Sequence, residues 1–449
     1  MINIKINSKD IVKGDTFIAI KGNNVDGHDY IEEAIKNGAS KIVVEKESNY
    51  QIDTLVVKNT KSYLNKYLVK HYSKDLSKLK IIGITGTNGK TTSAYLTYQL
   101  LNKLGKKAAY IGTIGFYING LVRELNNTTP DILTLYNLLY ECIKYKCEYV
   151  VIEISSHSLS LKRIEGLKLY RGGFTNLTQD HLDYHKTMER YLKEKVKIKK
   201  YLNNDGKMII NCDDASWTYF KSNDYITYGY NADIKILGHT FKNNRTTLKF
   251  IYEGKEYTTK YNLEGKFNIY NYLLAIGIVS SLSININKII KASKKIIAPP
   301  GRCETIKVRN KKIIIDYAHT PDAVKKIISE YKKIVSGNIY TIIGCGGDRD
   351  NTKRSTMGLC AVTLSDYVIF TNDNPRTESK EDIINDMLKD VTTKNYEIIY
   401  DRKNAIKEGM RLLSSKDVLL ILGKGHENYQ IIGRNKKKFS DREEVLKNK

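Results

Sequence analysis

Residues 80–92 decide the fold of the chain and read Lys80-Ile81-Ile82-Gly83-Ile84-Thr85-Gly86-Thr87-Asn88-Gly89-Lys90-Thr91-Thr92. The apolar run at the start predicts a buried strand, and the apolar spacing that follows predicts a helix ending at Gly105. Glycines between a strand and a helix let backbone N–H groups turn toward phosphate oxygens, and the helix N-terminus adds partial positive charge. Lys90 can then reach the terminal phosphates, and Thr91 can hold Mg²⁺. The sequence therefore predicts a nucleotide-binding loop with seven contact residues, Gly86, Thr87, Asn88, Gly89, Lys90, Thr91 and Thr92.

The spacing of this loop departs from the strict phosphate-loop pattern, because Ile84 occupies the position of the first glycine. Gly86 instead stands three residues before Gly89. The alternative interpretation is a tight turn with a solvent-exposed lysine. The order of strand, loop and helix favours nucleotide binding.

Short apolar strands that run directly into polar loops recur along the chain. Such loops follow Ile84, Val150–Ile152, Ile342–Ile343, Val368–Phe370 and Leu419–Leu422. Ligands of open parallel sheets bind at the carboxyl ends of the strands. The pattern predicts two sheet domains that share one cleft, although polar loops also follow strands in other folds.

The predicted fold class is α/β with three domains. Residues 1–79 form a small α/β unit, with strands over Thr16–Ile20 and Lys41–Glu45 and a helix from Ile31 to Gly38 between them. Residues 80–299 form a central phosphate-loop domain with a parallel sheet. The paired prolines at Pro299-Pro300 mark the boundary to a Rossmann-like α/β domain over residues 300–449.

The composition of the 449 residues is that of a soluble globular protein, with 41% hydrophobic and 27% charged residues. No apolar run is long enough to span a bilayer, and the N-terminus lacks a secretory signal. Six scattered cysteines make disulfides and structural zinc unexpected, so we expect a reducing cytoplasm. The net charge of +25 is spread along the chain, which favours a generally basic surface over a nucleic-acid site.

Eight motifs together resemble one family. They are Asp26–Tyr30, Gly86–Thr92, Glu153–Ser158, Asp180–His185, Asp316–Pro321, Gly344–Asp350, Asp373–Arg376 and Gly423–Glu427. This set is similar to the Mur ligases, which build the stem peptide of peptidoglycan, and the match runs from about Ser8 to Arg442. Each motif is weak by itself, but the set covers essentially the whole chain.

The resemblance implies an ATP-dependent ligase in which the three domains hold a UDP-linked precursor, ATP and an amino acid, in that order. The side-chain carboxylate of D-glutamate in UDP-MurNAc-L-Ala-D-Glu attacks the γ-phosphate of ATP. The resulting acyl phosphate is then displaced by the amine of a diamino acid. The implied partners are small molecules only, with no nucleic acid and no membrane insertion, and we expect a monomer.

The resemblance also implies the catalytic residues. Lys90 and Thr91 serve the phosphates, Glu153 and His181 are Mg²⁺ ligands, and Lys195 is the lysine that the family carbamylates with CO2 to give a further metal ligand. A strand-end acid and a structural histidine are the ordinary alternatives for Glu153 and His181. Lys195 is one of many lysines on a polar helix, and only the resemblance singles it out.

The resemblance also implies residues that contact the UDP-linked precursor and ATP. The precursor contacts are Ser8, Asn127, Thr128, Thr129, Ser155 and Arg163. The remaining ATP contacts are Asn268, Asn271, Arg302 and Asp316. Helix capping is the alternative role for the two asparagines. Leu161 stands where some members have glutamine, and Asn7-Ser8-Lys9 stands where the family usually has Asp-Ser-Arg.

The motif Asp373-Asn374-Pro375-Arg376 indicates which amino acid is added. The distal end of meso-diaminopimelate carries an ammonium and a carboxylate, and an arginine is suited to pair with the carboxylate. The predicted diaminopimelate contacts are Arg349, Asp373, Asn374, Arg376, Gly423 and Glu427. Relatives that add lysine usually lack this arginine, so the resemblance favours meso-diaminopimelate. L-Lysine or another diamino acid remains the alternative substrate.

Three other protein classes remain as alternatives. A folylpolyglutamate synthetase-like ligase shares the phosphate loop, but the N-terminal domain and Asp373–Arg376 disfavour it. A basic nucleic-acid-binding NTPase requires clustered cations and stacking aromatics, which the sequence does not display. An inactive scaffold is disfavoured by Lys90, Glu153, His181 and Lys195.

Overall fold

The computed structural model describes residues 3–22, 25–47 and 49–448. The chain divides into two compact units, Met1–Ala232 with Leu274–Ser283 (unit 1) and Asp233–Leu273 with Ile284–Lys449 (unit 2). Helix α8 (Lys266–Ser280) is continuous and contributes residues to both units.

The N-terminal part of unit 1 is a small parallel sheet with strand order β1-β2-β3-β4. Its strands are β1 (Ile4–Lys5), β2 (Thr16–Ile18), β3 (Lys41–Val44) and β4 (Asp53–Val56). The helical segments are η1 (Ser8–Asp10), η2 (Gly27–Tyr30), α1 (Ile31–Lys36) and α2 (Thr60–Leu76). Ile31 and Ala34 are buried as their helical spacing predicts, and both predicted strands are present.

The central sheet of unit 1 has the strand order β12-β11-β10-β5-β9-β6-β7-β8. It contains β5 (Lys80–Thr85), β6 (Ala108–Gly112), β7 (Gly115–Ile118), β8 (Leu121–Arg123), β9 (Tyr149–Glu153), β10 (Leu169–Phe174), β11 (Leu202–Asn211) and β12 (Tyr225–Gly229). The first six strands of that order run parallel, and the last two form antiparallel hairpins. Ile84 pairs with Glu153 and Thr85 with Phe174, so the carboxyl ends of β5, β9 and β10 lie together.

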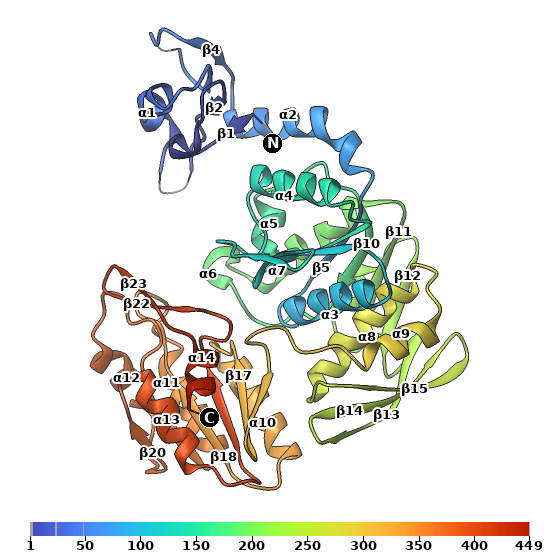
Figure 1. Cartoon of the computed structure of the whole chain (residues 1–449), viewed down its shortest axis with the longest axis vertical. Helices are drawn as coiled ribbons and strands as arrows, with labels where there is room; N and C mark the ends of the chain where they lie inside the picture. Colours follow the sequence, from blue (N-terminus) through green and yellow to red (C-terminus); the bar gives the residue numbers. More distant parts are fainter. Residues whose placement is uncertain (1–2, 23–24, 48, 449) are drawn as a thin grey trace. The chain divides into compact units, whose positions relative to one another are not determined.

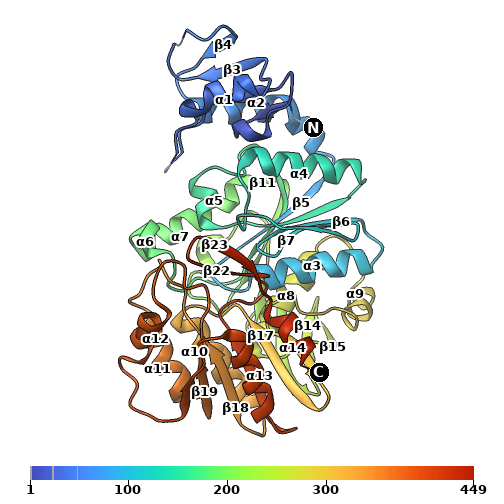
Figure 2. The same cartoon turned by 60° about the vertical axis from the view of Figure 1, so that its left-hand side comes forward.

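Helices cover both faces of this sheet. Helices α3 (Lys90–Lys103) and α4 (Ile132–Lys144) lie on opposite faces (Figures 1 and 2). The remaining helical segments are α5 (Ser156–Ser160), α6 (Leu182–His185), α7 (Met188–Val196), η3 (Lys197–Tyr201) and η4 (Trp217–Phe220). Helix α3 ends as predicted, because Gly105 adopts a φ of 77° directly after the last turn.

Unit 2 begins with an antiparallel meander of β13 (Ile234–Lys242), β14 (Arg245–Tyr252) and β15 (Lys255–Tyr261), followed by α8 and α9 (Ile286–Ser293). Its larger sheet has the order β16-β17-β21-β18-β19-β20. These strands are β16 (Glu304–Val308), β17 (Lys311–Asp316), β18 (Ile339–Ile343), β19 (Tyr367–Phe370), β20 (Tyr396–Ile398) and β21 (Val418–Leu422). All neighbours are parallel except β16 and β17, which confirms the predicted parallel sheet.

Two hydrophobic clusters lie on the two faces of the larger sheet. Along β21, Leu420 and Leu422 belong to one cluster, whereas Leu419 and Ile421 belong to the other. The first cluster packs against α10 (Pro321–Ile334), α11 (Arg354–Leu364) and α12 (Lys380–Leu388), and the second against α13 (Arg402–Leu412) and α14 (Asp441–Lys447). A hairpin of β22 (Tyr429–Ile432) and β23 (Asn435–Lys438) follows β21. The predicted α/β class is therefore confirmed.

Across the described ranges, no helix combines the length and the apolar character that a membrane crossing requires.

Candidate active site

The loop between β5 and α3 is held in a turned conformation by the segment after β10. The N–H of Thr87 donates to the carbonyl of Asn176 over 2.8 Å, and the Thr175 hydroxyl donates to the carbonyl of Asn88 over 2.7 Å. Gly86 has a φ of 146°, and a Cβ there would lie 1.8 Å from Thr175 Oγ1. Glycine is therefore required at this position.

Two lysine amines converge on this loop. Lys90 Nζ donates to the carbonyls of Gly86 and Thr87 over 2.9 and 2.8 Å. Lys195 Nζ, from α7, donates to the same Gly86 carbonyl over 2.7 Å. The Lys195 side chain is only 1% exposed, and burial, followed by the positive charge of Lys90, holds its pKa well below the usual value. The structure thus brings together two residues that lie 105 positions apart in the sequence.

Glu153 is a fully buried carboxylate at the end of β9. Thr91 Oγ1 donates to its Oε2 over 2.8 Å, and the Thr113 hydroxyl donates to the same oxygen over 3.1 Å. The N–H of Thr113 and the Tyr110 hydroxyl both donate to Oε1. Thr91 and Glu153, each predicted as a Mg²⁺ ligand, are therefore direct neighbours.

Three histidines lie beside the loop and α7. His181 packs edge-on against His157, with ring centroids 4.9 Å apart, and His157 lies 5.5 Å from His185. Burial lowers the pKa of all three imidazoles, so they favour the neutral form. His181, the predicted metal ligand, has a half-exposed side chain whose Nε2 lies 3.4 Å from Asp180 Oδ2. Across the described ranges, no three His, Cys, Asp or Glu side chains form a ready-made cation site.

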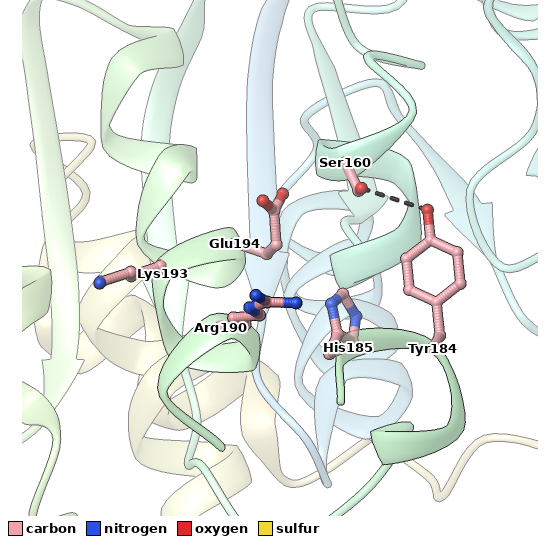
Figure 3. A pocket seen from close by; sticks show the side chains of 6 residues that line it. All are labelled: Ser160, Tyr184, His185, Arg190, Lys193 and Glu194. Atoms are coloured by element: carbon pink, nitrogen blue, oxygen red, sulfur yellow. Dashed lines mark hydrogen bonds between the residues drawn. The ribbon is translucent and has the colours of Figure 1, made fainter. Parts of the chain in front are cut away.

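An open pocket of about 350 Å³ lies on another side of α7. Its lining residues are Ser160, Tyr184, His185, Arg190, Lys193 and Glu194. Figure 3 shows the Arg190 guanidinium directed toward His185 and the Lys193 amine directed away from the other groups. The Ser160 and Tyr184 hydroxyls are 3.2 Å apart. Lys195 belongs to the buried side of the same helix, so the pocket and the phosphate loop use different faces of α7.

The predicted precursor contacts of the central domain lie beside Glu153. Thr129 donates its hydroxyl to the Glu153 carbonyl over 2.7 Å and accepts from the N–H of Ser155 over 3.1 Å. Arg163 Nη1 donates to the Thr129 carbonyl over 2.8 Å. Thr128 lies 3.0 Å from the Thr113 hydroxyl, and Asn127 is exposed. Through Thr113 and Glu153, four of these residues connect to Thr91 of the phosphate loop: Thr128, Thr129, Ser155 and Arg163.

Ser8, the predicted uracil-side contact, lies in the N-terminal sheet domain. It is buried, and its hydroxyl donates to Glu33 Oε2 over 2.5 Å. In this structure the Ser8 hydroxyl therefore has a protein partner.

The remaining predicted ATP contacts, Asn268, Asn271, Arg302 and Asp316, lie in unit 2. Asn268 donates its amide to the Glu264 carbonyl over 2.7 Å, and Asn271 donates to Asn268 Oδ1 over 3.1 Å, both as buried residues of α8. The Arg302 guanidinium lies 4.5 Å from the centre of the Tyr317 ring. Burial raises the pKa of Asp316, whose Oδ2 accepts from the N–H of Cys303 over 2.8 Å.

Most of the predicted amino-acid contacts converge in unit 2, at the carboxyl ends of β19 and β21. Asn374 Nδ2 donates to Glu427 Oε2 over 2.8 Å. Arg376 adopts a φ of 53° and donates from Nη1 to the Gly347 carbonyl over 2.6 Å. A Cβ on Gly423 would lie 2.7 Å from Asp373 Oδ2, so the two loops touch. Arg349 is exposed on the neighbouring loop after β18.

Several residues of these sites were not selected from the sequence. Tyr110 and Thr113 donate to Glu153, but one tyrosine among 33 gives no signal in the sequence. Lys424 lies within the motif Gly423–Glu427, yet only its complete burial and its hydrogen bonds to Asn374 and Glu427 reveal its role. His157 lies within the motif Glu153–Ser158, and its ring contact places it beside His181.

The two sets differ in the chemistry that each can support. The set in unit 1 combines a glycine-containing turn before a helix, two lysine amines and a buried carboxylate, which suits phosphoryl transfer. The set in unit 2 combines a buried aspartate and a partly buried glutamate with an arginine and a lysine, which suits recognition of a small zwitterion.

Comparison with known proteins gives matches along nearly the whole chain. Residues 2–78 match the model described as Mur ligase family, catalytic domain. Residues 84–279 match the Mur ligase middle domain, and residues 301–425 match the Mur ligase, glutamate ligase domain.

Curated relatives share about two residues in five. The chain is 40% identical to UDP-N-acetylmuramoyl-L-alanyl-D-glutamate–2,6-diaminopimelate ligase 1 of Clostridium acetobutylicum, with 99% of this chain and 93% of the relative covered. It is 41% identical to the ligase of the same name from Fusobacterium nucleatum, with 98% and 92% covered.

Solved structures resemble the fold over the same extent. A structure of UDP-N-acetylmuramoyl-L-alanyl-D-glutamate–2,6-diaminopimelate ligase gives a TM-score of 0.71 at 29% identity, covering 100% of this chain and 94% of the other. MurF from Thermotoga maritima in complex with ADP gives 0.70 at 19% identity, covering 99% and 96%, and its likeness concerns the fold alone.

Proposed function

The chain belongs to the Mur ligase family, and we propose that it joins meso-2,6-diaminopimelate to UDP-N-acetylmuramoyl-L-alanyl-D-glutamate with ATP hydrolysed to ADP and phosphate. The observation that carries the proposal is the convergence of Lys90, Lys195 and the Thr91–Glu153 pair on one phosphate loop. The product serves peptidoglycan synthesis, and we propose a cytoplasmic monomer. Residues 1–79, 80–299 and 300–449 are the proposed precursor, ATP and amino-acid domains.

Phosphoryl transfer requires the γ-phosphate and the attacking carboxylate to be held in line while their charges are neutralised. The amides of Gly86–Thr92 and the amine of Lys90 surround the phosphates, and Asn268, Asn271, Arg302 and Asp316 bind the rest of ATP. Thr91 and Glu153 fit Mg²⁺, because one buried carboxylate and one hydroxyl, completed by phosphate oxygens and water, match its preference for oxygen ligands. His181 is the proposed ligand of a second Mg²⁺. Bound magnesium lowers the electrostatic cost of bringing two anions together.

Lys195 is the proposed site of carbamylation. Burial depresses the pKa of the Lys195 amine and thereby favours the free base, which is the form that adds to CO2. The amine nitrogen forms a bond to carbon, one proton is released, and the side chain becomes an anion. The carbamate would supply a further oxygen ligand for Mg²⁺.

The precursor is the second anion of the reaction. Ser8 binds its uracil end, and Asn127, Thr128, Thr129, Ser155 and Arg163 bind the sugar and peptide. Arg163 supports this role because it holds Thr129 next to Glu153 and the loop. The D-glutamate carboxylate attacks the γ-phosphorus, ADP leaves, and an acyl phosphate forms.

The residues of unit 2 that are proposed to bind the incoming amino acid (the amino-acid set) select the nucleophile. Arg376 pairs with the distal carboxylate of diaminopimelate, with Arg349 as the second arginine, and Asp373, Asn374 and Glu427 face the distal ammonium. Gly423 supports the set because it admits Asp373 at close range. The reacting amine, once deprotonated, attacks the acyl carbon and phosphate leaves, so one amide bond forms for each ATP consumed.

The test is a parallel ligation assay. Purified protein receives the UDP-dipeptide precursor, ATP and Mg²⁺ with either meso-diaminopimelate or L-lysine, and the product is identified by mass. The proposal expects the diaminopimelate product and little lysine product. Product with lysine alone assigns the alternative substrate, and no product with either contradicts the proposal.

A further inference from the structure

The amino-acid set of unit 2 contains a buried cation that the proposed contacts leave without a role. Lys424 follows β21, and its side chain is fully buried. Its Nζ lies 3.0 Å from Glu427 Oε2 and 3.2 Å from Asn374 Oδ1, and 5.6 Å from the centre of the Tyr429 ring. Burying a charged group costs free energy unless an opposite charge pairs with it, so the partners of Lys424 determine how its charge acts on the site.

Both partners of Lys424 belong to the set that faces the distal ammonium of the substrate. Glu427 Oε2 accepts from Lys424 and also from Asn374 Nδ2, over 2.8 Å. Asn374 Oδ1 accepts from Lys424 and from the N–H of Ile431, over 2.9 Å. Without substrate, the triangle of Lys424, Asn374 and Glu427 is therefore satisfied, and Glu427 is already compensated by one positive charge.

The second buried cation of this region does not provide that compensation. Arg402 donates from Nε and Nη2 to the two carboxylate oxygens of Asp441 over 2.7 and 2.8 Å, and both side chains are fully buried. Its charge is matched by Asp441. Burial raises the pKa of Asp373, and the charge of Lys424 opposes that rise more strongly than the charge of Arg402 does. Lys424 is thus the main positive charge available to both Asp373 and Glu427.

We propose that Lys424 is a specificity-determining residue that makes the amino-acid site prefer a zwitterionic distal group to a lone ammonium. This inference rests on the proposed function. With Lys424 in place, an incoming ammonium meets carboxylates that are already compensated. A substrate whose distal group is only an ammonium leaves the site with excess positive charge. A substrate that also places a carboxylate at Arg376 brings the net charge of the site back to neutral.

The charge balance predicts what happens when Lys424 loses its cation. Asp373 and Glu427 then present uncompensated negative charge to the substrate. L-Lysine is then expected to bind more tightly, because its distal ammonium replaces the missing cation. Diaminopimelate is expected to bind more weakly, because its distal carboxylate adds repulsion. A purely structural role would instead weaken both substrates together, so the ratio of the two distinguishes the roles.

The experiment compares Lys424→Met with the unaltered enzyme at saturating precursor, ATP and Mg²⁺. The ratio of kcat/KM for meso-diaminopimelate to kcat/KM for L-lysine is measured, and we expect it to fall at least tenfold, chiefly through the two KM values. Lys436→Met is the matched control, because Lys436 lies 3.8 Å from the same Tyr429 ring but is exposed on β23. This control is expected to keep the ratio within twofold.

A second variant covers the case in which Lys424→Met does not fold. Lys424→Met/Glu427→Gln removes both charges of the pair, and its ratio is compared with that of the unaltered enzyme, from which it is expected to differ by about threefold or less. An unchanged ratio in folded Lys424→Met, or a double variant whose ratio falls tenfold or more below that of the unaltered enzyme, overturns the role of Lys424. An unaltered enzyme that does not ligate diaminopimelate overturns the proposed function, and this inference with it.

Discussion

Lys195→Met is expected to lower kcat about 10³-fold while leaving the fold intact. The loss follows from removing the proposed carbamate anion next to the metal and phosphates. Two unit charges about 4 Å apart attract by about 4 kcal/mol at an effective dielectric constant of about 20. Since about 1.4 kcal/mol corresponds to a tenfold change in rate, the expected factor is about 10³.

The fold is expected to tolerate this change because Lys195 is buried and its depressed pKa favours the neutral amine. Methionine retains most of the side-chain volume beside the Tyr191 ring, whose centre lies 4.5 Å from Nζ. The change removes one hydrogen bond, to the Gly86 carbonyl, at a cost of about 1 kcal/mol. Thermal unfolding should therefore shift by only a few degrees.

The assay is phosphate release under saturating substrates, in buffer depleted of CO2 and again after bicarbonate is added. The unaltered enzyme should lose activity on depletion and regain it, whereas Lys195→Met should respond to neither. Lys193→Met, on the exposed face of the same helix, is the control and should stay within twofold. A folded Lys195→Met enzyme within tenfold of the original rate would refute the reasoning.

Four further outcomes are expected. Arg376→Ala should lose about 1.5–3 kcal/mol of preference for diaminopimelate over lysine, seen as a 10- to 100-fold fall in the kcat/KM ratio, and Arg434→Ala should leave that ratio unchanged. Gly86→Ala should weaken ADP binding at least tenfold by calorimetry, because the added Cβ would lie 1.8 Å from Thr175 Oγ1. The control is Gly238→Ala, whose Cβ would have no neighbour within 4 Å and which should bind ADP normally. Arg402→Met should lower the free energy of unfolding by about 3–5 kcal/mol in urea, because Asp441 stays buried and unpaired, while the exposed Arg411→Met should change it by at most about 1 kcal/mol. Finally, the free energy of unfolding should fall from pH 7 to pH 5. Burial lowers the pKa of His157, His181 and His185, so the unfolded chain binds more protons than the folded one in this range. If a His185→Gln variant shows the same dependence of unfolding free energy on pH, His185 does not contribute.

The elements that carry the sites could be predicted because their signals are local. The strand at Lys80–Thr85 and the helix that ends before Gly105 follow from an apolar run, an apolar period and one glycine. Parallel pairing then brings the ends of β5 and β9 together, which explains why Thr91 and Glu153 meet although 62 positions separate them.

The charges that determine how the sites work could not be predicted from local signals. Nothing near Lys195 in the sequence distinguishes it from Lys193 or Lys197, and only the three-dimensional fold buries one and exposes another. The same holds for Lys424, whose partners Asn374 and Glu427 come from the ends of two strands. Pairing of buried charges depends on contacts between distant segments, which neither spacing nor composition encodes.

The hydrogen-bond shell of Glu153 gives a third example. The sequence placed Glu153 at a strand end, as observed. It gave no reason to join Tyr110 and Thr113 to it, because these residues belong to the end of β6 and the turn that follows. A Cβ on Gly112 would lie 2.2 Å from Glu153 Oε1, so the glycine at the end of β6 makes room for the carboxylate.

Isotope transfer tests the account most directly. The precursor is prepared with ¹⁸O in both oxygens of the D-glutamate side-chain carboxylate, and the phosphate released during ligation is analysed by mass. An acyl phosphate formed by attack of that carboxylate on ATP predicts one ¹⁸O atom in every phosphate released. Unlabelled phosphate from a reaction that still forms the amide, so that the displaced carboxylate oxygen leaves in another product such as water, would contradict the account.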